Sequence, residues 1–476
     1  MTASGFDRPQ GGVAGAFQEQ QIDRPTIRAV VVVPDLTGRD SGAAGDGQRA
    51  PIQHSIDDRL EEAVGLTRAI ELTVAGAEVV RIANPRPATL FGTGKVTELG
   101  ERIEELDAGL VIVDHALSPI QQRNLEREWN AKVLDRTGLI LEIFGRRART
   151  REGALQVELA HLMFQRSRLV RSWTHLERQR GGFGFLGGPG ETQIETDRRL
   201  LRDRIEKIRS ELEKVTRTRT LHRSGRAKVP YPVVAIVGYT NAGKSTLFNR
   251  LTGARVLSQD QVFATLDPTM RELQLGSGRR VILSDTVGFI SDLPTMLVAA
   301  FRATLEEVVA ADIILHVRDI SHPETEAQRQ DVVQVLDDLL GETGENAAPI
   351  IEVWNKIDLV DADRLDTIDA ERQQAINLGS PPILASAVTG QGLDALSDAI
   401  DEIIGRGDVT LRIVVPAAAG KLRHWLHENA TVLGTLACAD DSGSSELEVR
   451  ISNVKHGQLL HRLEALGLSA EHRPAD

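Results

Sequence analysis

Apolar residues recur along the chain in patterns that change near residue 153. Before that point, short apolar runs alternate with segments in which apolar residues return every three to four positions. Such runs predict buried strands, and the longer period predicts helices packed against them. The alternation predicts a small parallel sheet covered by helices. Strands are expected at 27–33, 77–82, 110–113 and 132–134, and helices at 57–73, from 96 onward, and at 120–129.

A seven-residue repeat begins after Gly153. Its first seam is Leu155, Leu159, Leu162, Arg166, Leu169, Trp173 and Leu176. Its second seam is Ile194, Arg198, Leu201, Ile205, Ile208, Leu212 and Val215. Two seams joined by a short loop can bury each other only when the helices run antiparallel, so an antiparallel helical hairpin is predicted.

The loop between these seams contains a literal GxGxxG at residues 182–187. A dinucleotide fingerprint needs a strand before it and a helix at its last glycine. Here the first helix is expected to continue to Arg180, and the second to begin with a capping box at Thr192–Glu195. The match is therefore interpreted as accidental. The segment 180–190 is predicted to be a glycine-rich tip, with a plain connecting turn as the alternative.

Charge is distributed unevenly. The chain has a net charge of −12, but residues 146–228 hold 21 Lys/Arg against 10 Asp/Glu, which leaves −23 for the rest. A basic arm of net +11 on an acidic body is typical of polyanion binding; a solvated helical face rich in arginine is the alternative. Glycines allow close backbone approach, and aromatics stack on unpaired bases. The predicted RNA contacts are Arg180, Gly182, Phe183, Phe185, Gly187 and Gly188.

Composition excludes several classes of protein. A chain of 476 residues with 41% hydrophobic residues is long enough for about three domains. It has no apolar run long enough to span a membrane, and its N-terminus does not read as a secretory signal. A single cysteine excludes a disulfide framework and fits a reducing compartment, so a cytoplasmic location is expected. The sequence does not fix an oligomeric state, and a monomer is the working expectation.

The strongest motif is Gly238–Ser245, GYTNAGKS, which follows the apolar run 233–237 and precedes a helix expected at 246–251. In such a P-loop, backbone N–H groups surround the phosphates, Lys244 neutralises the β/γ oxygens and the Ser245 hydroxyl binds Mg²⁺. A second Gly-Lys pair, in FGTGK at 91–95, fails the spacing, because Thr89 and Val96 occupy the required Gly and Ser/Thr positions. It is interpreted as the turn that starts a helix.

Three further motifs follow in order. Asp285–Gly288 (DTVG) supplies a carboxylate near the metal and an N–H for the γ-phosphate. Asn355–Asp358 (NKID) places a carboxylate where guanine N1–H and N2–H₂ can donate, which adenine cannot do. Ala385–Ala387 lets a backbone N–H contact guanine O6. Each motif alone is weak, but the four in this order predict a GTP-binding domain.

Between the P-loop and Asp285 lies the segment 263–269, FATLDPT, in which a switch threonine is required. Thr265 is favoured over Thr269 by the positions of the Phe and Pro. Phe289 stands where Ras-like enzymes place a water-orienting Gln, so slow intrinsic hydrolysis that a partner raises is expected. Asn241 resembles the asparagine that binds K⁺ in several GTPases; a local turn bond is the equally weighted alternative.

The predicted site is as follows. Catalytic roles are assigned to Lys244, Thr265, Gly288 and Asn241. Nucleotide-binding positions are Gly238, Tyr239, Thr240, Asn241, Ala242, Gly243, Lys244, Ser245, Thr246, Phe263, Ala264, Thr265, Leu266, Asp267, Asp285, Thr286, Val287, Gly288, Asn355, Lys356, Ile357, Asp358, Ser386, Ala387 and Val388. The metal-binding residues are Ser245, Thr265 and, through water, Asp285. The cofactor is Mg²⁺, the substrate is GTP, and K⁺ is a further hypothesis.

From about residue 55 onward the chain resembles the HflX family of ribosome-binding GTPases. The resemblance rests on FGTGK, GGPGETQIE, GYTNAGKST, FATLDPT and DTVGFI. It implies a cytosolic GTPase that binds the large (50S) ribosomal subunit, reaches toward the peptidyl-transferase region with its hairpin, and splits stalled or idle ribosomes. It also implies that the tip touches ribosomal RNA. Some members bind ATP through the N-terminal domain, for which no residues are identified here.

The expected fold class is α/β, with a doubly wound, mostly parallel P-loop GTPase domain. The domains are a mobile tail (1–26), an N-terminal α/β domain (27–150, flexible at 36–54), the basic hairpin (151–228), the GTPase domain (229–407) and a small α+β domain (408–476). Two other functions stay open, namely a GTP-dependent clamp in which hydrolysis is incidental, and a Ras-like switch acting on proteins. A signalling switch has no need of the basic arm.

Overall fold

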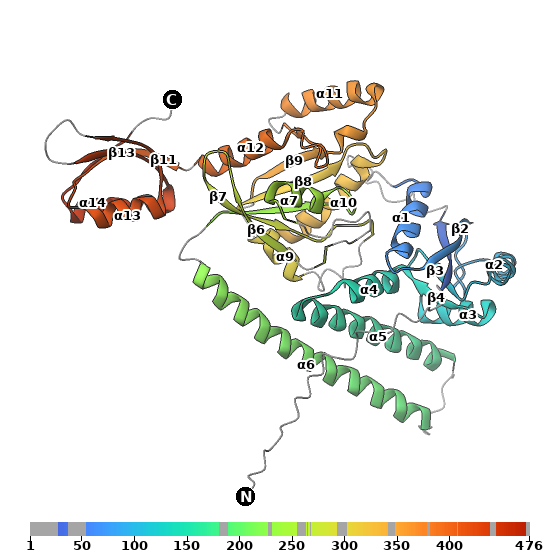
Figure 1. Cartoon of the computed structure of the whole chain (residues 1–476). Coiled ribbons are helices and arrows are strands. Elements are labelled where there is room, and N and C mark those ends of the chain that lie inside the picture. Colours follow the sequence, from blue (N-terminus) through green and yellow to red (C-terminus); the bar gives the residue numbers. More distant parts are fainter. Residues whose placement is uncertain are drawn as a thin grey trace, which may run out of the picture.

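Figure 1 shows the computed structural model of the chain. It describes residues 27–36, 54–179, 189–226, 231–254, 263, 265–266, 268–292, 302–340, 348–377, 381–406, 408–437 and 444–472. The described part consists of three sheets with the helices that pack on them, and one pair of long helices. None of the helices described there is both long and apolar enough to cross a membrane.

The N-terminal sheet is parallel, with strand order β2-β1-β3-β4. Its elements are β1 (Arg28–Leu36), α1 (Ile56–Arg68), β2 (Thr73–Ile82), α2 (Thr93–Glu105), β3 (Leu110–Val113), α3 (Pro119–Trp129), β4 (Lys132–Asp135) and α4 (Arg136–Arg147). Alternate side chains of β1 point to opposite faces. Val30 and Val32 pack with α2 and α3, while Val31 and Val33 pack with α1 and α4.

The predicted parallel sheet is confirmed, with three corrections to its elements. The first helix ends at Arg68 rather than Thr73, because the β2 strand already begins at Thr73. Helix α4 was not predicted; Asp135 both ends β4 and caps this helix by accepting from Gly138 N–H, so no turn separates them. Of the segment predicted to be flexible, Leu36 ends a strand and His54 contacts Asp331; residues 37–53 lie outside the described ranges.

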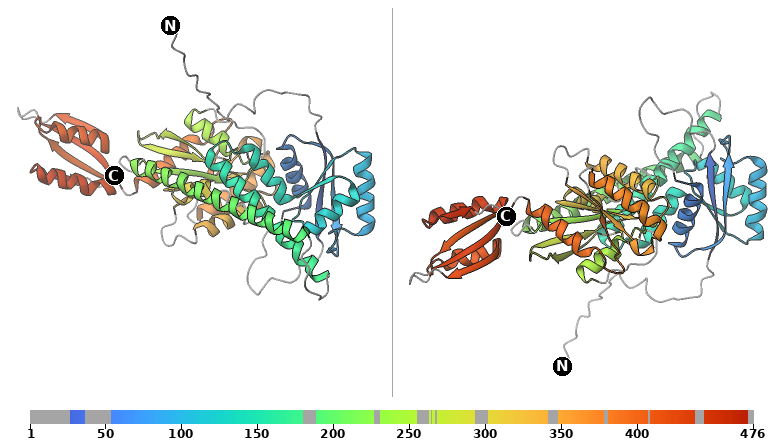
Figure 2. Two further views of the ribbon diagram at one scale, coloured as in Figure 1. Left: turned by 90° about the horizontal axis from the view of Figure 1, so that it is seen from below. Right: turned by 90° about the horizontal axis from the view of Figure 1, so that it is seen from above.

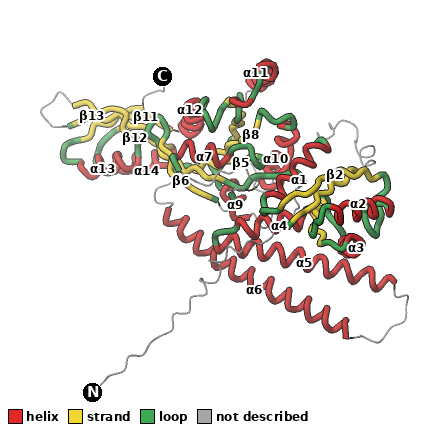
Figure 3. The backbone as a smooth tube through the Cα atoms, turned by 45° about the vertical axis from the view of Figure 1, so that its right-hand side comes forward, coloured by secondary structure: helices red, strands yellow, loops and turns green. Residues whose placement is uncertain are grey.

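The hairpin consists of α5 (Arg151–Gln179) and α6 (Pro189–Arg226), which lie side by side in all the views (Figures 1, 2 and 3). Two ion pairs cross between them, Arg204–Glu158 and Arg151–Glu211. Moving seven residues back along α5 moves the partner seven residues forward along α6. The helices therefore run antiparallel, as predicted.

The predicted seams are only partly right. In α6, Ile205 and Ile208 are buried as expected. Among the described side chains of α5, the buried apolar ones are Val157 and Ala160, because this side of the helix packs on α4 as part of the N-terminal core. The predicted Leu155, Leu159 and Leu162 are half-buried and Arg166 is exposed, while the side chains of Leu169, Trp173 and Leu176 lie outside the described ones. Helix α6 begins at Pro189, so Thr192 lies inside the helix and is not its cap.

The GTPase-domain sheet has strand order β10-β9-β8-β5-β7-β6, and only β6 is antiparallel to its neighbour. Its elements are β5 (Val233–Gly238), α7 (Lys244–Thr252), β6 (Thr269–Gln274), β7 (Arg280–Asp285), α9 (Arg302–Val309), β8 (Ile313–Asp319), α10 (Thr325–Leu340), β9 (Ile350–Asn355), the 3₁₀ turn η2 (Ile357–Leu359), α11 (Ala362–Asn377), β10 (Ile383–Leu384) and α12 (Leu393–Gly405). Helices α7 and α12 pack on one face, and α9 and α10 on the other. The doubly wound fold is confirmed.

The C-terminal elements form a separate antiparallel sheet, of order β12-β13-β11-β14, with two helices packed into its core (Figure 2). They are β11 (Asp408–Val415), α13 (Gly420–Asn429), β12 (Thr431–Ala437), β13 (Ser445–Ser452), α14 (Asn453–Ala465) and β14 (Ala470–His472). The α+β prediction is confirmed. The short edge strand β14 was not predicted.

Candidate nucleotide-binding site

The P-loop leaves β5 at Gly238 and enters α7 at Lys244. Gly238, Asn241 and Gly243 have φ values of 152°, 61° and 92°, so the loop turns its N–H groups in a way that few L-residues adopt. A Cβ on Gly243 would lie 2.2 Å from Asn355 Nδ2, so only glycine fits there. The result is a concave loop of backbone N–H groups at a helix N-terminus, which suits phosphate.

Lys244 is buried at the base of this loop, where its ammonium donates to the Tyr239 carbonyl at 2.6 Å. Burial lowers the pKa of Lys244 to about 8; nearby Lys356 lowers it too, while Asp285 opposes the shift. A buried cation that lacks a strong counter-anion is stabilised by an arriving phosphate. The position of Lys244 therefore favours a polyanionic ligand.

The three residues predicted to bind metal come together at the end of β7. Ser245 Oγ lies 2.7 Å from Asp285 Oδ2 and 2.9 Å from Thr265 Oγ1, and Thr265 Oγ1 donates to the same carboxylate oxygen at 2.9 Å. Thr269, the alternative, is the first residue of β6 and pairs with Asp285 only through the sheet register. Thr265 is thus the threonine that reaches this cluster.

The cluster fits Mg²⁺. It offers hydroxyl and carboxylate oxygens, the ligands that this hard cation prefers. Asp285 Oδ1 is buried and has no hydrogen-bond partner in the described part of the chain, and burial raises the pKa of this carboxyl, so a cation would relieve both. Among the described residues no group of three or more His, Cys, Asp or Glu could hold a metal. A cation here would therefore share its coordination with nucleotide phosphates and water.

Gly288 lies directly against the P-loop. A Cβ on it would be 2.9 Å from both Lys244 Nζ and Thr240 Cα, so any side chain here would require the loop to move. Thr286 Oγ1 donates to the Ile236 carbonyl, and Val287 is in the core, so neither side chain faces the loop. Phe289 is buried as well and has no group that could orient water.

The base-recognition motifs meet at the ends of β9 and β10. Asn355 is buried; its Nδ2 donates to the Ala242 carbonyl at 2.8 Å, and its Oδ1 accepts from Ala387 N–H at 3.0 Å. It therefore joins the P-loop to the loop after β10, a role its motif position alone does not reveal. Asp358 in η2 is exposed and open to a base. Lys356 pairs with Asp319 at 2.7 Å, Ser386 is buried, and Val388 is exposed.

Of the remaining predicted positions, some are described by the structure and others lie outside the described ranges. Thr246 lies in the first turn of α7, and Ile357 opens η2. Leu266 and Phe263 are buried next to Thr265. Asn241 is exposed, and its side chain makes no hydrogen bond within the described residues, so the local turn bond is not seen. Ala264 and Asp267 lie outside the described ranges, as do the expected RNA contacts Arg180, Gly182, Phe183, Phe185, Gly187 and Gly188.

Comparison with known families covers most of the chain. The matching family models are described as GTP-binding GTPase N-terminal (residues 57–145), GTP-binding GTPase Middle Region (147–226), 50S ribosome-binding GTPase (233–356) and HflX C-terminal domain (373–473). GTPase HflX of Magnetococcus marinus is 48% identical over 417 residues, which cover 88% of this chain and 93% of that protein. The chain belongs to the HflX family of GTPases.

Other relatives agree. GTPase HflX of Escherichia coli is 45% identical over 400 residues, covering 82% of this chain and 90% of that protein. Among solved structures, a GTP-binding protein from Sulfolobus solfataricus in complex with GDP is similar over 79% of this chain and 98% of that chain, at 25% identity and a TM-score of 0.42. The P-loop GTPase domain of this HflX-family chain is identified by its family match, its sequence motifs and the strand order of its sheet.

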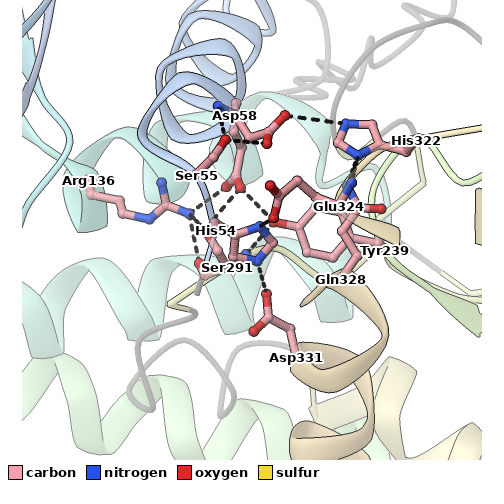
Figure 4. A network of polar contacts seen from close by, with 11 residues as sticks. His54, Ser55, Asp58, Arg136, Tyr239, Ser291, His322, Glu324, Gln328 and Asp331 are labelled. Atoms are coloured by element: carbon pink, nitrogen blue, oxygen red, sulfur yellow. Dashed lines mark hydrogen bonds and ion pairs between the residues drawn. The ribbon is translucent and has the colours of Figure 1, made fainter. Parts of the chain in front are cut away.

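One polar network of this HflX-family chain was not predicted (Figure 4). It joins Glu62 of α1 and Arg136 of α4 to Tyr239 of the P-loop and to Ser291. The partners are between 52 and 229 residues apart in the sequence, and no local pattern relates them. The sequence signal for it is the tyrosine at the second position of the P-loop, whose hydroxyl bonds Glu62 and Ser291 in the structure.

Proposed function

We propose that this GTPase hydrolyses GTP in a Mg²⁺-dependent way, associates with the 50S subunit and splits stalled or idle 70S ribosomes in the cytoplasm. The observation that carries the proposal is the basic arm. Residues 146–228 have a net charge of +11, and their described part forms one antiparallel helical pair on an otherwise acidic chain. The match of residues 233–356 to a 50S ribosome-binding GTPase supports the same partner.

In this proposal each part of the site has one task. The P-loop N–H groups and Lys244 bind the phosphates, Asp358 selects guanine, and Gly288 N–H contacts the γ-phosphate. Ser245, Thr265 and Asp285 hold Mg²⁺, which neutralises phosphate charge when bound. Since Phe289 cannot orient water, hydrolysis depends on a partner that orders the switches. K⁺ near Asn241 is a further part of the proposal.

The nucleotide state controls the grip on RNA in this scheme. GTP favours the RNA-bound arrangement of the hairpin, binding forces the subunits apart, and hydrolysis releases the factor. Such a cycle requires different RNA affinities in the two nucleotide states. We also propose the five-part division at residues 26, 150, 228 and 407, with the C-terminal unit left without an assigned role.

Cosedimentation with 50S subunits tests this function. With a non-hydrolysable GTP analogue the chain should pellet with 50S, and with GDP it should bind at least about tenfold more weakly. Binding should fall steeply between about 50 and 200 mM salt, because phosphate contacts release counterions. GTP turnover should rise when 50S is added. Equal binding in all nucleotide states, or turnover indifferent to 50S, would refute the proposal, and the second result would favour the signalling switch. Subunit separation over many cycles by a variant that hydrolyses GTP slowly would favour the clamp.

A further inference from the structure

Helix α4 contacts the nucleotide site at both of its ends. Its first residue, Arg136, has a side chain only 8% exposed, and donates to Asp114 and Glu62, both at 2.5 Å. The same guanidinium donates to the carbonyl and the hydroxyl of Ser291, at 2.7 and 2.9 Å. Although burial opposes its charge, Glu62 and Asp114 raise the pKa of Arg136, so it stays a cation.

This cluster fastens the segment that follows Gly288 to the P-loop. The Tyr239 hydroxyl donates to Glu62 at 2.5 Å and accepts from Ser291 N–H at 2.7 Å (Figure 4). Phe289 adds two backbone bonds to the P-loop, accepting from Thr240 N–H at 2.7 Å and donating to the Gly238 carbonyl at 3.1 Å. Gly288 is therefore held between the P-loop and a polar cluster in which Glu62 and Arg136 come from helices α1 and α4 of the N-terminal domain.

The last turn of α4 contacts the other switch. Phe144 packs edge-on against Phe263, with ring centroids 4.8 Å apart and planes at 81°. Phe263 has a φ of 58°, a conformation that is strained for a bulky residue and persists only where its surroundings enforce it. Two residues later, Thr265 reaches Ser245 and Asp285. Phe144 thus helps to fix the backbone that delivers this threonine.

We propose that α4 is the element that couples the basic hairpin to both switches, with Arg136 and Phe144 as positioning residues for GTP hydrolysis. Helix α4 ends at Arg147 and α5 of the hairpin begins at Arg151, so movement of the hairpin reaches α4 through three residues. The two ends of α4 then act on Gly288 and Thr265 without touching nucleotide. This inference rests on the site roles and the hairpin function proposed above.

Steady-state GTP hydrolysis by the full chain tests the coupling. Glu62→Gln and Ser291→Ala weaken the polar cluster at the first turn of α4. Phe144→Leu weakens the aromatic contact with Phe263 at its last turn. Each should lower kcat about fivefold while KM for GTP and Kd for GDP change less than about twofold, as expected when a positioning contact is lost. The stimulation of turnover by 50S should fall by a similar factor.

The matched control is Asp331→Asn. Asp331 accepts from His54 at 2.8 Å across the same interface, but within the described chain it makes no hydrogen bond to Tyr239 or Ser291 (Figure 4). It should leave kcat within about twofold of the original chain. If it lowers kcat as much as the three variants do, the effect is general to the interface and the inference is overturned. The inference also fails if the three folded variants keep full kcat and full stimulation.

Thermal unfolding establishes that each variant is folded, and Ser291→Ala, which removes only a hydroxyl, carries the test should Phe144→Leu not fold. Failure of the ribosomal proposal can be distinguished from failure of the positioning role. If 50S does not stimulate the unaltered chain, the ribosomal proposal fails, while intrinsic kcat in the variants still decides the positioning role.

Discussion

Two sheets in this molecule, one parallel and one mostly parallel, each deliver a Gly-Lys pair to the start of a helix, and only one of the two turns suits a phosphate. In the N-terminal sheet, Lys95 in the first turn of α2 is paired with Glu78 and, at 2.7 Å, with Glu98. In the GTPase-domain sheet, Lys244 donates to a backbone carbonyl, and burial lowers its pKa. The first lysine is already neutralised by the protein, whereas the second still needs an anion.

The backbone differs in the same sense. The P-loop has positive φ values at Gly238, Asn241 and Gly243, which turn successive N–H groups inward. At the start of α2, Gly92 has an ordinary φ of −67° and makes no concave loop. Asp114 and Asp135, at the ends of β3 and β4, are also occupied, by Arg136 and by Gly138 N–H. A Gly-Lys turn becomes a phosphate site only when its donors are left available.

Removing each lysine gives the largest contrast. Lys244→Ala should lower kcat/KM for GTP about 1,000-fold, since a preorganised cation facing transferred phosphate is lost. Lys95→Ala should leave kcat/KM within about twofold, because its ammonium serves only Glu78 and Glu98. Steady-state phosphate release measures both. A loss of GTP turnover of about tenfold in Lys95→Ala would contradict the claim that only Lys244 serves the nucleotide.

Two aspartates near the predicted guanine position give the second contrast. Asp358→Asn should reduce the preference for GDP over ADP about 100-fold, because an amide cannot accept both guanine donors. Asp361→Asn, three residues away, should leave the preference unchanged, since Asp361 caps the following helix by accepting from Arg364 N–H. Competition binding with a fluorescent nucleotide gives both ratios. Unchanged selectivity in Asp358→Asn would remove that residue from its role.

The two helix-start glycines should respond differently to a methyl group. Gly243→Ala combines a positive φ with a Cβ 2.2 Å from Asn355, and should cost about 2–3 kcal/mol of unfolding free energy as well as nucleotide binding. Gly92→Ala meets nothing within 4 Å and should cost less than about 1 kcal/mol. Urea unfolding measures the pair, and equal costs would contradict the difference in backbone geometry.

The smallest effect is on pH dependence. The pKa of Lys244 in the free chain is lowered to about 8, and a bound phosphate raises it, so the proton uptake on binding grows as the pH rises through about 8. Kd for GDP should therefore rise about fivefold between about pH 7.5 and 8.8. Calorimetry in buffers of different ionisation enthalpy should show a larger proton uptake at the higher pH than at the lower one. A constant Kd would contradict the lowered pKa.

The features of the site that could be predicted from the sequence are those whose residues are contiguous in the chain. The P-loop, DTVG and NKID each hold their chemistry within a few positions, so the convergence of Ser245, Thr265 and Asp285 could be foreseen. Helix α4 could not, because Asp135 serves as strand end and helix cap at once. The shifted seam of α5 has a similar cause: Val157 and Ala160 pack against α4 rather than against the partner helix. The Glu62–Arg136–Ser291 cluster exists only after folding.

The shared apolar core has a consequence for dissecting this protein. Val33 and Leu66 of the N-terminal domain belong to the same buried cluster as Val237 and Leu305 of the GTPase domain, with Phe144 and Phe263 in contact across the boundary. A fragment starting near residue 229 would expose the apolar side chains of that boundary to water and would tend to aggregate. The two units should melt together in a single calorimetric transition, and an excised GTPase fragment should need detergent or a replacement partner to remain dispersed.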